Sequence, residues 1–151
     1  MHTKPTSAPL PLFDRFGGQL SDAGAALPPA EALKLSLRLD LTRLLNVRNG
    51  LTIDEFLDGA PSSLDYGLPD TLHLSAQSAT DLQRWRQVIV RAIALYEPRL
   101  RQVAVRVTPS VHWPTMAWVE IRATASLSSE HVQFDFDAGL ANRASPWARH
   151  A

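Results

Sequence analysis

Residues 78–96 carry the clearest hydrophobic pattern of the chain, with apolar side chains at every third or fourth position. This period of about 3.6 residues predicts a helix with one buried face. Ser78 can cap the first turn, with Asp81 three residues further on in a capping-box position. Pro98 should end the helix, because proline has no backbone N–H and disfavours helical geometry at Glu97. The expected buried residues are Leu82, Trp85, Ile89, Ala92, Ile93 and Tyr96.

Residues 30–46 fit two patterns at once. Leucine at every second position from 33 to 41 is typical of a strand, but three of these leucines also share one helical face with two later ones. The scarcity of β-branched residues and the Pro28-Pro29 pair just upstream favour a helix, which ends before a turn at Asn49-Gly50. Residues 52–57 predict a second, short helix with Thr52 as its N-cap. The helical face of the first segment consists of Leu33, Leu37, Leu41, Leu44 and Leu45.

Beyond Pro98 the hydrophobic period changes to two, which predicts strands with one buried face. Three such segments follow one another with short loops between them, as in an antiparallel meander. The helices that precede them must cover the apolar face, so we expect a two-layer α+β fold with a three-stranded antiparallel sheet. The alternating apolar positions are Val103, Val105 and Val107, then Ala117, Val119, Ile121, Ala123 and Ala125, then Val132, Phe134 and Phe136.

The chain of 151 residues and 16.6 kDa has the size of one domain. Five of its eleven prolines lie in residues 1–29, which we expect to form an N-terminal Pro/Gly-rich arm. Residues 30–138 then form the folded domain and residues 139–151 a flexible C-terminal tail. The arm either packs on its own core or forms a short docking motif for a partner. Its apolar residues are Leu10, Leu12, Phe13 and Phe16.

The charges balance overall but not locally. Fifteen Lys and Arg match fifteen Asp and Glu, which argues against a general nucleic-acid binder and against capture by anionic lipid. Residues 51–81 contain six acidic and no basic side chains, whereas residues 82–106 contain six arginines and a single acid, Glu97. We expect partial pairing inside the fold, with the remaining arginines available to a charged partner.

No pattern in the sequence supports catalysis. There is no cysteine, the five histidines lack metal-site spacing, and neither a G-x-S-x-G motif nor a phosphate-binding glycine loop is present. Asp135 and Asp137 lie on one face of a predicted strand with Cα atoms ~7 Å apart, a separation that a glycosidase could use. Alternating aspartates more simply keep a strand face solvated. We therefore expect no enzyme activity, no metal and no cofactor.

The sequence also lacks a membrane-targeting pattern. No apolar run approaches the ~20 residues that a bilayer-spanning helix needs, and the first residues lack the apolar block of a secretory signal. We therefore expect a cytoplasmic protein without direct membrane insertion.

Glu97-Pro98-Arg99 forms a rigid corner between the predicted long helix and the first strand. Proline fixes the backbone between two opposite charges, so both side chains should project from the corner. One interpretation is a local ion pair. The other is a desolvated interface, where arginine can hold a carboxylate with two bonds. Spacing alone leaves both open.

Three segments carry a resemblance to a known family. They are SLRLDL with LLNVR in residues 36–48, SLDYGLPD in residues 63–70, and YEPRL in residues 96–100. Their order and spacing resemble TssE, the baseplate wedge subunit of type VI secretion systems. TssE is similar to the wedge protein of contractile phage tails that was long labelled lysozyme. The resemblance spans roughly residues 10–138.

The resemblance implies a structural role in a cytoplasmic baseplate docked at the inner membrane. Expected partners are the baseplate subunits TssF, TssG and TssK, the VgrG spike hub and the TssB–TssC contractile sheath, whose assembly the protein would help to start. Glu97, Pro98 and Arg99 would engage the neighbouring wedge core. An open sheet edge could accept a sheath strand by β-augmentation. No nucleic acid is expected as a partner.

Three alternatives remain from the sequence. The same module could belong to a phage or another contractile injection system, which neighbouring genes would reveal. It could be an anti-adaptor that binds a response regulator, since the fold also occurs there. It could be a muramidase, which a turbidity assay on cell walls would test.

Overall fold

The computed structural model describes residues 27–127 and 130–141 of the chain. The apolar arm residues Leu10 to Phe16 lie outside this part, as do residues 142–151. The elements are α2 (Pro29–Asn46), α3 (Ile53–Asp58), the short 3₁₀ helix η1 (Ser63–Asp65), α4 (Ala79–Tyr96), β1 (Leu100–Pro109), β2 (Met116–Leu127) and β3 (Glu130–Ala141).

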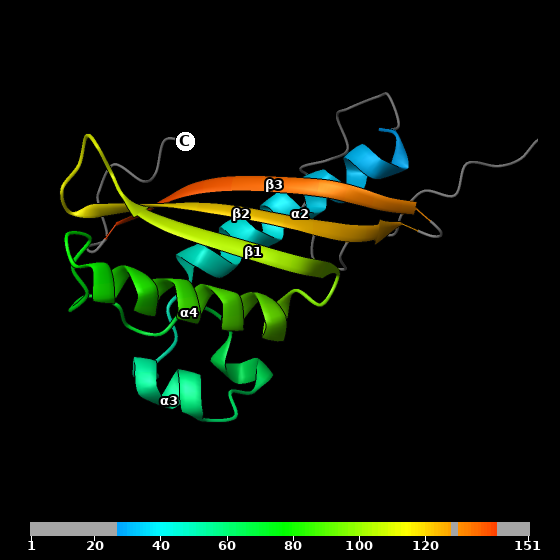
Figure 1. The fold of residues 1–151 in the computed structure, drawn as a ribbon. Helices are drawn as coiled ribbons and strands as arrows, with labels where there is room; N and C mark the ends of the chain where they lie inside the picture. The colour runs from blue at the N-terminus through cyan, green and yellow to red at the C-terminus, as the bar shows by residue number, and fades with distance from the viewer. Residues whose placement is uncertain (1–26, 128–129, 142–151) are drawn as a thin grey trace, which may run out of the picture.

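The three strands form one antiparallel sheet in the order β1-β2-β3, as expected for a meander. Val107 pairs with Val119 across β1 and β2, and Ile121 pairs with Phe136 across β2 and β3. α4 packs along β1, while α2 packs against β2 and β3. Figure 1 shows α2 crossing behind the strands and α4 running alongside β1, and this three-stranded antiparallel sheet with packed helices confirms the α+β fold.

The core lies between the sheet and the two long helices. All five leucines predicted for the buried face of α2 are buried, which confirms a helix there rather than a strand. Leu35 and Leu39 lie off that face and are half-buried. α4 buries four of the six predicted residues and adds Val88, while Leu82 and Tyr96 are half-buried at its ends.

Caps fix the ends of the helices. Thr52 and Glu55 form a reciprocal capping box at α3, and these hydrogen bonds lower the pKa of Glu55. Ser78 Oγ accepts the Asp81 N–H at 3.3 Å, but the Asp81 carboxylate accepts from Ser75 N instead of closing a box. α4 ends at Tyr96, two residues before Pro98, as expected.

The strands differ from expectation at two points. In β1 the register shifts between Arg101 and Ala104, where Gln102 has φ of 51°. This bulge interrupts the simple alternation. At the other end of the sheet, β3 runs to Ala141, so residues 139–141 are strand rather than tail. Gly139 continues the ladder because it pairs with Trp118 on β2.

Candidate interaction surfaces

The Glu97-Pro98-Arg99 corner joins α4 to β1. Glu97 is the C-cap of α4, and its carbonyl accepts the Leu100 N–H at 3.1 Å. Glu97 is only 4% exposed, so its carboxylate points into the protein and does not project from the corner as expected. A buried carboxylate is stable only when it is paired. Its partner is Arg99.

The Arg99 guanidinium bonds with two segments at once. Nε donates to Glu97 Oε1 at 2.6 Å and Nη2 to Glu97 Oε2 at 2.5 Å, a two-pronged contact. Nη1 donates to Ser36 Oγ at 3.2 Å, and Nη2 also donates to the Asp40 carboxylate. Ser36 and Asp40 both lie on α2, so this cluster ties the α4–β1 junction to the first helix. The bonds to Glu97, with further help from Asp40, raise the pKa of Arg99 although burial opposes the shift.

The ion-pair interpretation of the corner is therefore confirmed, while the partner-binding role stays a prediction. Arg99 keeps 35% of its side chain exposed, so its guanidinium reaches the surface beside the buried carboxylate. Sequence reasoning did not identify Ser36 and Asp40 as its partners. Their spacing of four residues, which places both on one side of a helix, is the available signal.

The three segments that carry the family resemblance meet around this corner. The Tyr66 and Tyr96 rings contact edge to face with centroids 5.3 Å apart, and Tyr96 Oη donates to the Asp65 carbonyl at 2.8 Å. Burial raises the pKa of Tyr66, and the negative charges of Asp40 and Glu97 raise it further. The segments are thus parts of one packed region although they are distant in the sequence.

Gly67 shows how closely the loop approaches the first helix. It has φ of 113°, and a Cβ there would lie 2.7 Å from the Val47 carbonyl oxygen. Leu68 N donates to that same carbonyl at 2.9 Å, and Asn49 Nδ2 donates to the Asp65 and Gly67 carbonyls. Only glycine fits this backbone without strain.

The acidic and basic blocks pair in part, as expected. Arg84 bonds Asp54 at 2.5 Å. Arg91 instead donates to the carbonyls of Phe56 and Gly59, both at 2.7 Å. The basic block is therefore held against the acidic segment partly through backbone oxygens, which a charge count cannot reveal.

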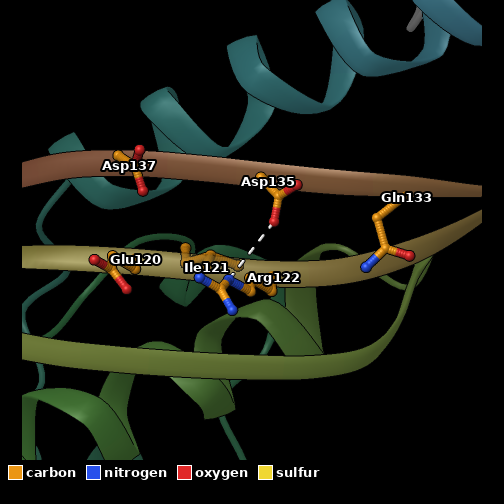
Figure 2. Close-up of a pocket in the computed structure, with 6 residues that line it drawn as sticks. All are labelled: Glu120, Ile121, Arg122, Gln133, Asp135 and Asp137. Atoms are coloured by element: carbon orange, nitrogen blue, oxygen red, sulfur yellow. Dashed lines mark ion pairs between the residues drawn. The ribbon is translucent and has the colours of Figure 1, made fainter.

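The outer face of the sheet holds a different set of charges. Figure 2 shows a shallow hollow on this face between β2 and β3. Arg122 Nε lies 3.8 Å from Asp135 Oδ1, with both side chains largely exposed. Asp135 and Asp137 lie in the open here, as expected for a solvated strand face. The lining residues are Glu120, Ile121, Arg122, Gln133, Asp135 and Asp137.

Residues 27–127 and 130–141 contain neither a metal centre nor a membrane-spanning helix. No group of three or more His, Asp or Glu side chains in this part could hold a metal ion. None of the helices there is long and apolar enough to cross a membrane.

The family described as baseplate wedge protein gp25 matches residues 31–130, which is more than half of the chain and includes the corner and most of the sheet. The chain belongs to this baseplate wedge family. Its members are structural baseplate proteins, so the chain has a structural role in a baseplate. No curated protein matches the sequence significantly.

Two solved structures show the same fold as this wedge-family protein. One is the baseplate complex from the type VI secretion system, with 17% identity, a TM-score of 0.57, and coverage of 76% of this chain and 98% of that chain. The other is described as a candidate tail lysozyme from Geobacter sulfurreducens, with 16% identity, a TM-score of 0.52, and coverage of 75% and 94%. At these identities the likeness concerns the fold alone, and the lysozyme description says nothing of catalysis in this chain.

The two edges of the wedge protein's sheet differ. β1 is interrupted by the bulge at Gln102. The Val105 carbonyl of β1 accepts a 3.0 Å hydrogen bond from Arg86 Nε of α4, which occupies an outward acceptor. β3 pairs with β2 in continuous register over 12 residues. Among residues 27–127 and 130–141, no hydrogen bond is made to the outer edge of β3.

Backbone pairing decides which residues of β3 face this open edge. Val105 directs its carbonyl away from β2, so the Val105–Ile121 pair lacks mutual hydrogen bonds. Because bonded and non-bonded pairs alternate, Ile121 bonds on its other side with Phe136. The odd-numbered residues from Gln133 to Gly139 therefore direct their N–H and C=O groups outward.

Proposed function

We propose that the chain is the TssE-type wedge subunit of a type VI secretion baseplate, with no catalytic activity. It joins the wedge of TssF, TssG and TssK around the VgrG hub and offers a sheet edge on which the TssB–TssC sheath begins to assemble. The wedge-family match, the fold shared with a type VI baseplate complex and the three TssE-like segments support this assignment.

The proposed contact with the sheath is supported by the difference between the two edge strands, β1 and β3. An added strand needs a row of unused N–H and C=O groups on a regular strand. β1 is a poor acceptor because Gln102 breaks its register and Arg86 occupies an outward carbonyl. β3 is regular along its whole length, so the sheath strand is expected to add there.

The corner supplies the wedge contact in this proposal. Arg99 donates four hydrogen bonds to Glu97, Ser36 and Asp40, and a guanidinium has five N–H groups. Among the described residues no acceptor bonds the second N–H of Nη1, so this N–H remains for a partner, on a side chain whose orientation the four bonds fix. A fixed donor of this kind favours a specific contact, because little side-chain entropy is lost when the partner binds.

Proline substitution tests the strand acceptor without removing a ladder bond. Gln133 has an outward N–H, so Gln133→Pro removes a donor from the open edge and leaves the β2–β3 bonds in place. We expect Gln133→Pro to prevent assembly of co-expressed TssB–TssC into sheaths while the chain still co-purifies with TssF and TssG. Gln133→Ala is the matched control and should retain both. Normal sheath assembly on the proline variant would contradict the proposed role of β3.

A test of the wedge contact needs a substitution at the corner that leaves the fold intact. Exchanging Glu97 and Arg99 would place a carboxylate beside Asp40 and disturb the fold, so loss of binding would prove little. Arg99→Lys keeps the positive charge beside Glu97 but lacks the planar fork. We expect the amount of TssF and TssG that co-purifies to fall strongly, while the melting temperature of the chain falls only slightly. Asp58→Lys, at an exposed position on α3, is the control. If Arg99→Lys co-purified with TssF and TssG in full amount, the corner would not be part of the interface.

A phage or another contractile injection system is the second candidate, because the family that matches is named for the baseplate wedge and for no particular machine. The genes beside this one distinguish the two. Membrane-complex genes of type VI systems beside it would support the first candidate, and phage tail genes would support the second.

A further inference from the structure

We propose that the β3 edge selects an extended segment with basic side chains at alternate positions, and that the acidic residues on the outer face make this selection. The inference rests on the proposed role of β3 as a strand acceptor and adds the chemistry of the strand that binds. Three features of the outer face support it.

The first feature is that the acidic side chains and the open backbone groups belong to the same residues. Asp135 and Asp137 are exposed on the outer face, and both direct their N–H and C=O groups to the free edge. Outward side chains of an added strand would stand beside these carboxylates at Cβ separations of ~5 Å. Neighbouring side chains at this distance contribute directly to the pairing.

The second feature is that the carboxylates lack adequate partners. Glu120 lies directly opposite Asp137, which places two negative charges side by side, and neither forms an ion pair with another described residue. Figure 2 shows the two acids together on the outer face. Within the described part of the chain, the only ion-pair contact of Asp135 is the loose 3.8 Å contact to Arg122. Like charges at directly opposed positions destabilise a sheet, and a cation on an added strand would relieve this repulsion.

The third feature is an apolar position next to the two carboxylates. Gly139 is the next residue after Asp137 that directs its backbone groups outward. Because glycine has no side chain, it leaves the residue opposite it on β2 uncovered. Trp118 lies opposite Gly139 and is 45% exposed. A Cβ on Gly139 would lie 2.9 Å from the Met116 methyl group and 3.9 Å from ring atoms of Trp118, so two apolar side chains cover this part of the strand. An added strand can therefore place a large apolar side chain there against Trp118.

A second copy of this chain does not fit the edge. Pairing of β3 with β3 of another molecule in antiparallel register around Asp135 and Asp137 would bring the carboxylates of the two strands together. This repulsion disfavours self-association through an otherwise open edge. The same charges that select a basic strand therefore protect the free protein from dimerisation.

Two peptides test the inference with the full chain. One has the 12-residue length of β3 and alternates valine with lysine, and the other carries glutamate in place of each lysine. We expect the lysine peptide to shift the backbone NMR signals of β3 and to bind about tenfold more tightly than the glutamate peptide. The difference should shrink at high salt, because the carboxylates are exposed.

A double variant provides the decisive comparison. Asp135→Lys with Asp137→Lys should reverse the preference between the two peptides. Asp58→Lys, which adds positive charge on α3, should leave it unchanged. Equal binding of both peptides to the unmodified chain would overturn the charge selection while leaving strand acceptance intact. Binding of neither peptide would overturn strand acceptance at β3, and this inference with it.

Discussion

The corner at Arg99 and the outer face of the sheet contain similar charges that are used in opposite ways. At the corner, Glu97 is almost fully buried and its two oxygens are bonded to Arg99 at 2.5–2.6 Å. On the outer face, Arg122 and Asp135 are mostly exposed and 3.8 Å apart. Buried charges must be paired to be tolerated, whereas exposed pairs contribute ~0–1 kcal/mol. Corner charges therefore hold the fold together, and face charges remain available to a partner.

The largest expected effect is the loss of the arginine at the corner. Arg99→Ala leaves the Glu97 carboxylate buried without a counter-charge and frees α2 from the α4–β1 junction. We expect the free energy of unfolding to fall by about 2–3 kcal/mol, less than for a fully buried pair because Arg99 is partly exposed. Chemical denaturation measures this change.

If the two regions differ as described, removing a charge from the outer face should lower the free energy of unfolding much less. Asp135→Ala, the matched variant, should change the free energy of unfolding by no more than about 0.5 kcal/mol. Equal losses of unfolding free energy in Arg99→Ala and Asp135→Ala would mean that burial does not make the corner charges more important for stability than the outer-face charges.

Local signals in the sequence were enough to predict most of the fold. The boundaries of α4 follow from Ser78 and Pro98, because caps and breakers act within a few residues. The strand order follows from three alternating segments with short loops between them. The buried face of α2 was recognised once its composition favoured a helix over the competing alternation.

The contacts that define the site were harder to predict because they join distant segments. Arg99 reaches Asp40 and Ser36 across 59 and 63 residues, and no periodic pattern encodes such a pairing. Arg86 belongs to the basic block, whose unpaired arginines the sequence leaves available to a charged partner, but its guanidinium bonds the backbone of β1. The bulge at Gln102 leaves the alternation of valines intact in the sequence, so only the backbone reveals it.

The second prediction concerns the closed edge. Arg86→Ala frees the outward Val105 carbonyl and removes a charge-assisted hydrogen bond of 3.0 Å, so we expect a loss of about 1 kcal/mol in the free energy of unfolding. Val105 should also become more accessible to an added strand, although the bulge still limits pairing. NMR shifts on addition of the lysine peptide would reveal binding at β1. If β1 of Arg86→Ala bound the peptide with the same affinity as β3, Arg86 alone would account for the closed β1 edge.

The third prediction concerns the like charges on the outer face. Asp137→Asn removes the repulsion with Glu120, so the free energy of unfolding should rise by a few tenths of a kcal/mol. The gain should disappear at high salt, where screening already weakens the repulsion. Binding of the lysine peptide should weaken in the same variant. A stability loss in Asp137→Asn would mean that the carboxylate has a structural partner after all.

The smallest expected effect is a shift in the titration of a tyrosine. The chain has two tyrosines, Tyr66 and Tyr96, and burial raises the pKa of both. Because each folded-state pKa lies above the unfolded value of about 10, their contribution to stability is complete below pH 10 and is lost as the pH rises through the folded values. Asp40 and Glu97 add to the shift at Tyr66, so Asp40→Asn should lower its pKa, as followed by ultraviolet absorbance in Tyr96→Phe. Asp137→Asn in the same background should leave that titration unchanged, because the charge it removes is not among those that shift Tyr66. Equal shifts from the two substitutions would show that the corner and the outer face share one electrostatic environment, and the distinction between them would not hold.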